Sequence, residues 1–107
     1  GDNSIVLDSE ANSITVSGQK KVEIKTGSNS IIIDSDKNSI AMSGQMKIEI
    51  KSGSNPITID SAANSIAISS QLQLNIKAPQ IMIESDGMMT IKSSGILTLQ
   101  GSLVKIN

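Results

Sequence analysis

The chain has 107 residues, with nine lysines against ten acidic residues and a formal net charge of −1. This balance excludes the basic footprint of a nucleic-acid-binding protein. The chain contains no aromatic residue, no Cys and no His, which excludes a disulfide scaffold, a thiolate metal site and the commonest general base. It has no apolar run of membrane-spanning length and no signal-peptide pattern. Because it begins at Gly1 rather than Met, we expect a piece of a longer protein.

A unit of 26 residues occurs three times in succession. The copies are GDNSIVLDSEANSITVSGQKKVEIKT at residues 1–26, GSNSIIIDSDKNSIAMSGQMKIEIKS at 27–52 and GSNPITIDSAANSIAISSQLQLNIKA at 53–78. A degenerate tail follows at residues 79–107. A fixed period of this length is typical of repeat architectures, so we expect one repetitive domain over residues 1–107.

Each copy contains three short segments of the form apolar–x–apolar, and the tail adds four more. Alternation with a period of two predicts β-strands that have one buried and one exposed face. The pattern therefore predicts an all-β chain with thirteen short strands and no helix. The inward positions form the predicted core, which consists of Ile5, Leu7, Ile14, Val16, Val22, Ile24, Ile31, Ile33, Ile40, Met42, Ile48, Ile50, Ile57, Ile59, Ile66, Ile68, Leu74, Ile76, Ile81, Ile83, Met89, Ile91, Leu97, Leu99, Val104 and Ile106.

The residues between the predicted strands are typical of turns. Glycine can adopt positive φ without steric cost, which suits the corner positions of Gly18, Gly27, Gly44, Gly53, Gly87, Gly95 and Gly101. Asparagine tolerates the same region and bonds to its own backbone in turns. It recurs in two series, Asn12, Asn38 and Asn64, and Asn3, Asn29 and Asn55.

Two architectures fit a strand every eight or nine residues. One is a single-chain β-solenoid, and the other is three chains wound round one axis. Short strands need partners on both edges, and an interior without aromatic residues is narrow enough for Ile and Val to fill without voids. The sequence therefore favours an intertwined triple-stranded β-helix, a triangular prism formed by a homotrimer, in which the strands of each face come from all three chains.

The candidate sites are few. Asp34, Asp36 and Asn38 are spaced like the first ligands of a calcium loop, which also needs Gly at its sixth position and Glu at its twelfth. Ser39 and Gln45 occupy those positions, so the segment is interpreted as a solvated corner. The methionines are interpreted as gap-filling residues rather than metal ligands.

We expect no enzymatic activity and no cofactor, because no nucleophile–base pair can be built without His or Cys. Glu23 with Lys25, and Glu49 with Lys51, share the outward face of their predicted strands. Such exposed pairs contribute about 0–1 kcal/mol, and we interpret them as charges that favour solubility and protect strand edges.

Units such as SITVSGQ, SIAMSGQ and KIEIKSGSN, and the terminal run MMTIKSSGILTLQGSLVKIN, resemble the C-terminal needle of VgrG-type spike proteins of type VI secretion systems. Similar proteins are the central spikes of contractile phage tails, pyocins and related injection particles. The resemblance covers the whole chain, and its most specific feature is the register of thirteen segments ending in GSLVKIN. It implies a homotrimeric β-helix that punctures a target envelope when a sheath contracts.

The resemblance also implies partners and a location. In the family, the blunt C-terminal end commonly carries a small conical cap protein rich in a Pro-Ala-Ala-Arg (PAAR) repeat, and an effector is the other expected cargo. The protein would act outside the producing cell, within an injection particle or phage tail, against a target cell envelope. The implied cap-binding residues are Gly101, Ser102, Leu103, Val104, Lys105, Ile106 and Asn107.

Two alternatives stay open beside the spike. An adhesive or receptor-binding β-solenoid is disfavoured, because binding faces usually carry aromatic residues and this chain has none. A trimeric stalk from a tail fibre or surface protein, without a piercing role, fits the same strand pattern.

Overall fold

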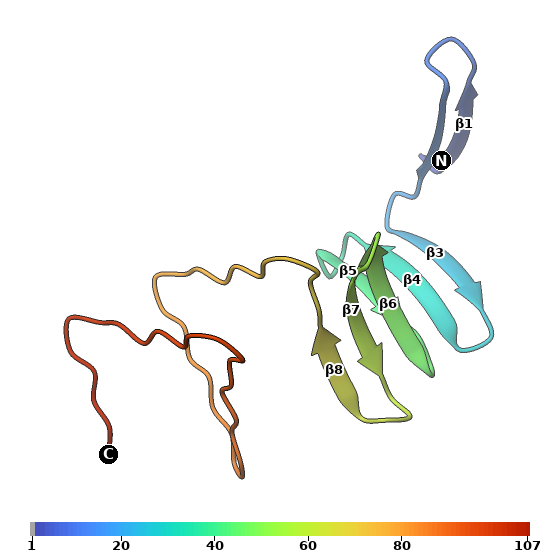
Figure 1. Ribbon diagram of the computed structural model, residues 1–107. Coiled ribbons are helices and arrows are strands. Elements are labelled where there is room, and N and C mark those ends of the chain that lie inside the picture. The colour runs from blue at the N-terminus through green and yellow to red at the C-terminus, as the bar shows by residue number, and fades with distance from the viewer. Residues whose placement is uncertain (1) are drawn as a thin grey trace. The chain divides into compact units, whose positions relative to one another are not determined.

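The computed structural model describes residues 2–107 and is all-β, with no helix among those residues; Gly1, which opens the first predicted repeat, lies outside them. The chain divides into two compact units, Gly1–Leu74 and Asn75–Asn107. All the strands lie in the first unit (Figure 1), and they are β1 (Ser4–Asp8), β2 (Ser13–Ser17), β3 (Lys21–Thr26), β4 (Asn29–Asp34), β5 (Ser39–Ser43), β6 (Lys47–Ser52), β7 (Asn55–Asp60) and β8 (Ser65–Ile68).

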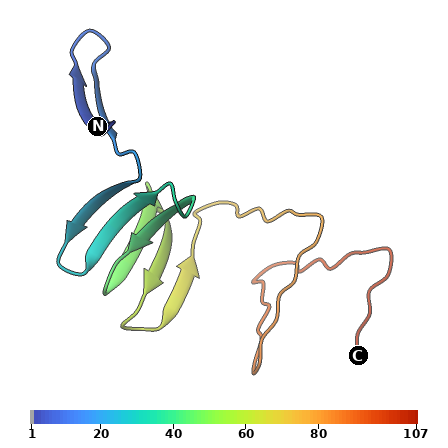
Figure 2. The same ribbon diagram turned by 180° about the vertical axis from the view of Figure 1, so that it is seen from behind.

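The eight strands form three antiparallel sheets, ordered β1-β2, β3-β4-β5 and β6-β7-β8. Every pair joins two strands that follow each other along the chain, as the two meanders in Figure 2 show. One 26-residue unit therefore does not correspond to one sheet. Each three-stranded sheet takes its first strand from the end of one unit and its other two from the start of the next.

Left-handed residues reverse the chain between paired strands. Thr26 pairs with Asn29 across a two-residue loop, in which Gly27 has a φ of 54°, and Gly53 has a φ of 55° at the equivalent place. Two-residue hairpin loops need positive φ at their first position because only this twist matches that of the strands. The longer loops end at the first predicted asparagine series, with φ between 50° and 52° at Asn12, Asn38 and Asn64.

Aspartate side chains close these longer loops. Oδ1 of Asp8 accepts hydrogen bonds from the backbone N–H groups of Glu10 and Ala11, each at 3.0 Å. Asp34 accepts from the N–H of Lys37, and Asp60 from that of Ala63, both at 3.1 Å. Each aspartate therefore satisfies loop N–H groups that have no strand partner, and the Asp34 corner is a turn of this kind.

Of the seven corner glycines, Gly27 and Gly53 adopt positive φ, and the other five do not. Gly18 and Gly44 are needed for another reason. A Cβ atom built on them would lie 2.3 Å from the carbonyl oxygen of Lys21 and 2.4 Å from that of Lys47, respectively. At both sites the chain leaves one sheet through a corner too tight for any side chain.

Eight of the thirteen predicted strand segments lie on the observed strands. The last five, which begin at Leu74, Ile81, Met89, Leu97 and Val104, form no strand in the described chain. A short extended segment is a strand only where a neighbouring strand accepts and donates its hydrogen bonds in a ladder, and no such strand pairing occurs among residues 69–107. Within the chain, β1 to β8 pair with their own neighbours in sequence.

Replacing the left-handed glycines tests the turn assignment. Gly27→Ala and Gly53→Ala should each lower the free energy of unfolding by about 1–2 kcal/mol, because Ala is strained at positive φ. Gly87→Ala is the matched control, since Gly87 has no positive φ and nothing lies within 4 Å of an added Cβ. Urea unfolding at one protein concentration measures all three, and an equal loss in the control would contradict the assignment.

Candidate interaction surface and repeat corners

The strand register gathers aliphatic side chains on one face of each sheet. In β3-β4-β5, Val22 lies opposite Ile33, which lies opposite Ile40. Residues directly opposite each other in an antiparallel pair share a face. A second row, Ile24, Ile31 and Met42, lies on the same face two residues along each strand.

The other two sheets repeat this arrangement. The aliphatic face of β6-β7-β8 has the rows Ile48–Ile59–Ile66 and Ile50–Ile57–Ile68, and that of β1-β2 has the pairs Ile5–Val16 and Leu7–Ile14. We call these three surfaces the aliphatic faces. They hold sixteen of the predicted core residues, with four on the face of β1-β2 and six on each of the other two faces.

None of the aliphatic faces is covered in a single chain. Among residues 2–107 no side chain is buried. Ile40 is 75% exposed and Ile66 is 72% exposed, although both are among the predicted core residues. The remaining ten predicted core residues lie beyond β8, and the proposed cap-binding stretch Gly101–Asn107 is exposed as well. The chain thus presents one apolar surface per sheet without a core of its own.

The opposite faces are more polar and carry an ion-pair cluster. Glu23 on β3 lies 2.9 Å from Nζ of Lys21 and 3.9 Å from Nζ of Lys25. Lys21 and Lys25 both lie two residues from Glu23 on the same face of β3, and the predicted partner, Lys25, is the more distant of the two. The hydrogen bond and the charge of Lys21 lower the pKa of the Glu23 carboxyl, and Glu23 in turn raises the pKa of Lys21.

A network of side-chain-to-backbone hydrogen bonds braces the corners between sheets. Oδ1 of Asn29 accepts from the backbone N–H of Gln45 at 2.9 Å. The Asn3–Gln19 and Asn55–Gln71 pairs repeat this bond at 2.7 and 2.8 Å. The second asparagine series therefore holds the chain sixteen residues further on, a role that the sequence analysis did not foresee. The signal was present, because Gln19, Gln45 and Gln71 recur with the same spacing.

Serine hydroxyls complete two of these three corners, those at Gln19 and Gln45. Oγ of Ser61 donates to the carbonyl oxygens of Gln45 and Met46 at 2.7 and 3.1 Å. Ser35 makes the same contacts one repeat earlier, with the carbonyl oxygens of Gln19 and Lys20 at 3.1 and 3.0 Å. Both corners are thus held from two sides, by an asparagine before the corner and a serine after it.

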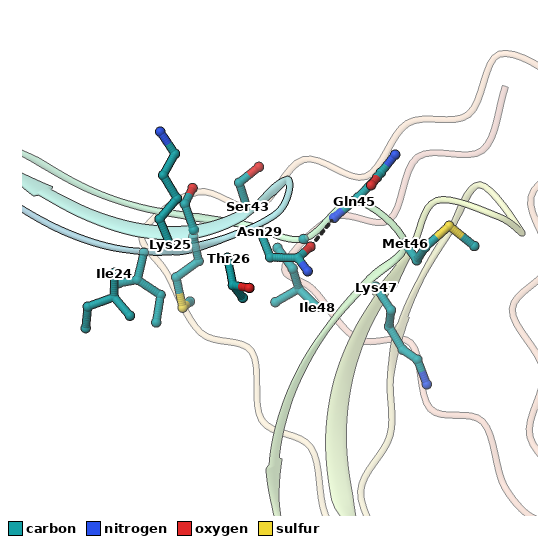
Figure 3. Close-up of a pocket in the computed structure, with 13 residues that line it drawn as sticks. Ile24, Lys25, Thr26, Asn29, Ser43, Gln45, Met46, Lys47 and Ile48 are labelled. Atoms are coloured by element: carbon teal, nitrogen blue, oxygen red, sulfur yellow. Dashed lines mark hydrogen bonds between the residues drawn. The ribbon is translucent and has the colours of Figure 1, made fainter.

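An open hollow of about 670 Å³ lies where β5 leads into β6 (Figure 3). Its lining includes Ile24, Met42 and Ile48 together with Lys25 and Lys47, and it contains no Asp, Glu, His or Cys. A second hollow lies one repeat earlier, and each of its lining residues has a counterpart 26 residues later in the first. A hollow that recurs with the repeat and carries no acid–base pair is a packing feature rather than a catalytic site.

Residues 2–107 contain no cluster of three or more His, Cys, Asp or Glu side chains that could hold a metal ion. They contain no helix of a length and hydropathy suited to crossing a membrane. The aliphatic faces and the uncovered segment after β8 are therefore the features from which function can be argued.

The Glu23 ion pairs predict a measurable pH dependence. The folded-state pKa of Glu23 is below its usual 4.5, so the pair stabilises the fold above the unfolded pKa, and this contribution is lost as the pH falls through the folded pKa. Lys21→Gln should return the Glu23 pKa toward 4.5, whereas Lys25→Gln, which removes the more distant partner, should change it less. NMR titration of the Glu23 side-chain carboxyl measures this, and an equal effect of the two substitutions would contradict the geometry.

Comparison with protein-family models, with curated proteins and with solved structures finds no match to this chain. The resemblance to injection-machine needles therefore rests on the sequence pattern alone. The uncovered aliphatic faces and the braced corners are the structural features that bear on its function.

Proposed function

We propose that three copies of this chain form the needle of a contractile injection machine. The needle transmits axial force into a target cell envelope and carries a PAAR-type cap or an effector at its C-terminal end. The observation that carries the proposal is that all three sheets present an aliphatic face while no residue of the described chain is buried. Sheets with such faces need a cover, because uncovered apolar area on this scale marks an interaction surface.

Further copies of the same chain are the best occupants of the aliphatic faces. The faces consist of Ile, Val, Leu and Met, so they complement one another in shape and chemistry without any paired charge. The net charge of −1 allows copies to approach without strong mutual repulsion. Homo-oligomers with closed symmetry are the commonest assemblies of soluble chains.

A three-sided assembly suits the dimensions of the faces. Each strand contributes only two inward side chains, so a face is narrow, and three such faces can meet along one axis with their aliphatic side chains in the centre. The tight corners at Gly18 and Gly44 support this arrangement, because they redirect the chain each time it leaves a sheet. The result would be a dry interior inside continuous hydrogen-bonded sheets, which resists bending and compression.

The functional roles of the two ends differ in this proposal. The repeats supply length and stiffness, and Gly101–Asn107 form the tip on which a cap or an effector sits. The protein acts outside the producing cell, as part of an injection particle or phage tail. The hollows do not offer a catalytic constellation, and the proposed role needs no cofactor.

A charge on an aliphatic face tests the assembly. Wild-type protein should have a solution mass of about 34 kDa, three times 11.2 kDa, in light scattering coupled to size exclusion. Ile40→Asp should lower the mass to about 11 kDa, because it would bury an unpaired carboxylate in the assembly. Ala41→Asp is the matched control on the same edge strand, since Ala41 lies on the opposite face. A wild-type mass of one chain would overturn the proposal, and retention of the full mass by Ile40→Asp would exclude this face from the interface.

Particle shape and cap binding separate a needle from a plain stalk. Thirteen strands per face, the eight observed plus the five remaining segments, give a rod about 60 Å long at about 4.8 Å per strand. Electron microscopy should show rods of this length, and a purified PAAR-type cap protein should bind at one end only. Rods of the expected length that bind no cap would favour the stalk, and particles of another shape would contradict both.

A further inference from the structure

The sheet β1-β2 has one strand fewer than each of the other two sheets. In β3-β4-β5 and β6-β7-β8, the middle strands β4 and β7 have a partner on both edges. β1 lies one repeat before β4 and has the sequence of a middle strand, since NSIVLD corresponds to NSIIID and NPITID. Within the described chain, however, β1 pairs only with β2. Its other edge, which β3 and β6 cover in the later sheets, is open.

The exposed fractions of the side chains show what a first strand covers. Ile5 and Leu7 on β1 are 74% and 75% exposed. Their counterparts on β4, Ile31 and Ile33, are 42% and 50% exposed, and the counterparts on β7 are 40% and 42% exposed. The same side chains are thus about half-covered where a first strand is present and largely exposed on β1.

Ser9 also differs from its counterparts in its hydrogen bonds. The backbone N–H of Ser35 donates to the carbonyl oxygen of Lys20 at 2.8 Å, and that of Ser61 donates to the carbonyl oxygen of Met46 at 3.0 Å. In both sheets this bond joins the end of the middle strand to the residue before the first strand. Ser9 occupies the same repeat position, and its N–H has no such partner among residues 2–107.

The strands that occupy the equivalent edge share one sequence pattern. β3 reads KVEIKT and β6 reads KIEIKS, so both have lysine, an aliphatic residue, glutamate, an aliphatic residue and lysine in that order. The register places Lys21 opposite Asp34, and the same lysine–aspartate pair recurs between β6 and β7. The pKa of Lys21 is raised, chiefly by Glu23 and to a smaller extent by the charge of Asp34. Opposite charges that face each other across two strands stabilise the pair, and on β1 the corresponding aspartate is Asp8.

We propose that the open edge of β1 is a docking site for one extended peptide strand with this lysine–aliphatic–glutamate–aliphatic–lysine pattern. The peptide runs antiparallel to β1 in the register of β3 on β4, with its first lysine opposite Asp8 and its glutamate opposite Val6. Its two aliphatic side chains join the rows of Ile5 and Leu7, so that the face of β1-β2 holds six aliphatic side chains like the other two.

A separate peptide strand is the best occupant of this edge. In strand addition, main-chain hydrogen bonds supply the affinity and alternate side chains supply the selectivity. A second copy of the chain is a poorer occupant, because its own strands with this pattern are already paired with β4 and β7. The site belongs to a single chain, so it goes beyond the proposed function and does not require the trimer.

A labelled peptide with the sequence of residues 20–27, KKVEIKTG, tests the site on the full-length chain. Fluorescence anisotropy should show saturable binding of one peptide per chain. Hydrogen exchange should show protection gained at those amides of residues 4–8 that point away from β2. The control peptide KKEVIKTG exchanges valine and glutamate. It should not bind, because the exchange moves the charge to the aliphatic face.

Two substitutions at Val6 test the register. Val6 is 48% exposed and lies opposite Thr15, on the face away from Ile5 and Leu7, so either charge can be introduced without disturbing the aliphatic face. Val6→Glu should bind the peptide about fivefold more weakly than Val6→Lys, because it sets like charges opposite each other across the two strands. Asp8→Asn should also weaken binding and reduce its dependence on salt.

A chain with KKVEIKT placed ahead of residue 1 supplies the strand within the same molecule. The extension reproduces the sequence that joins β3 to β4, because residues 1–8 then follow it as residues 27–34 follow β3. In this variant the outward amides of residues 4–8 should reach the protection of those of β4 and β7. The free peptide should no longer bind, because the edge is already occupied.

The outcomes decide the proposal without reference to the trimer. Failure of the wild-type chain to bind the peptide at millimolar concentration would overturn it. Equal binding to Val6→Glu and Val6→Lys would contradict the register. Protection of the outward amides of residues 4–8 before any peptide is added would show that a second copy covers the edge, and would overturn the proposal as well. Light scattering on the same samples tests the proposed function separately, because a single chain of 11.2 kDa can bind the peptide whether or not it assembles.

Discussion

The left-handed residues at the chain reversals decide where this chain can pair with itself. A strand of five or six residues has no stability without a neighbour, and a neighbour from the same chain needs a turn that brings it back. Gly27, Gly53 and the asparagines at 12, 38 and 64 provide that turn. Where Ala78 and Pro79 stand instead, self-pairing ends, although the alternation of apolar residues continues.

Pairing within the chain does not complete the fold, because it produces surfaces rather than an interior. The register lines up aliphatic side chains on one face of each sheet and mostly polar ones on the other, and no side chain of residues 2–107 is buried. The free energy of apolar burial is therefore available only on association. In the proposed assembly, this ties the stability of the repeats to the presence of further copies.

Periodicity was sufficient to predict eight of the nine strand positions in the repeats and which aliphatic side chains share a face. It was insufficient to predict partners, because alternation states which face a residue occupies and not which strand lies beside it. The same limit applies to Gly18 and Gly44, whose role depends on a carbonyl oxygen three residues away, and to Lys21, whose contact with Glu23 depends on side-chain conformation. The five segments from Leu74 onward were predicted as strands because they have the same alternation of apolar residues. That alternation carries no information about whether a partner strand is within reach.

The braced corner recurs every 26 residues with the same asparagine, glutamine and backbone partners, and this has an evolutionary consequence. A duplicated or deleted unit meets identical corners on both sides, so recombination between units changes the number of strands by three without creating a new junction. In the proposed assembly, each unit gained or lost alters the length by about 14 Å. Reach could therefore be tuned to the thickness of the envelope to be crossed, while the end that follows β8 is inherited unchanged.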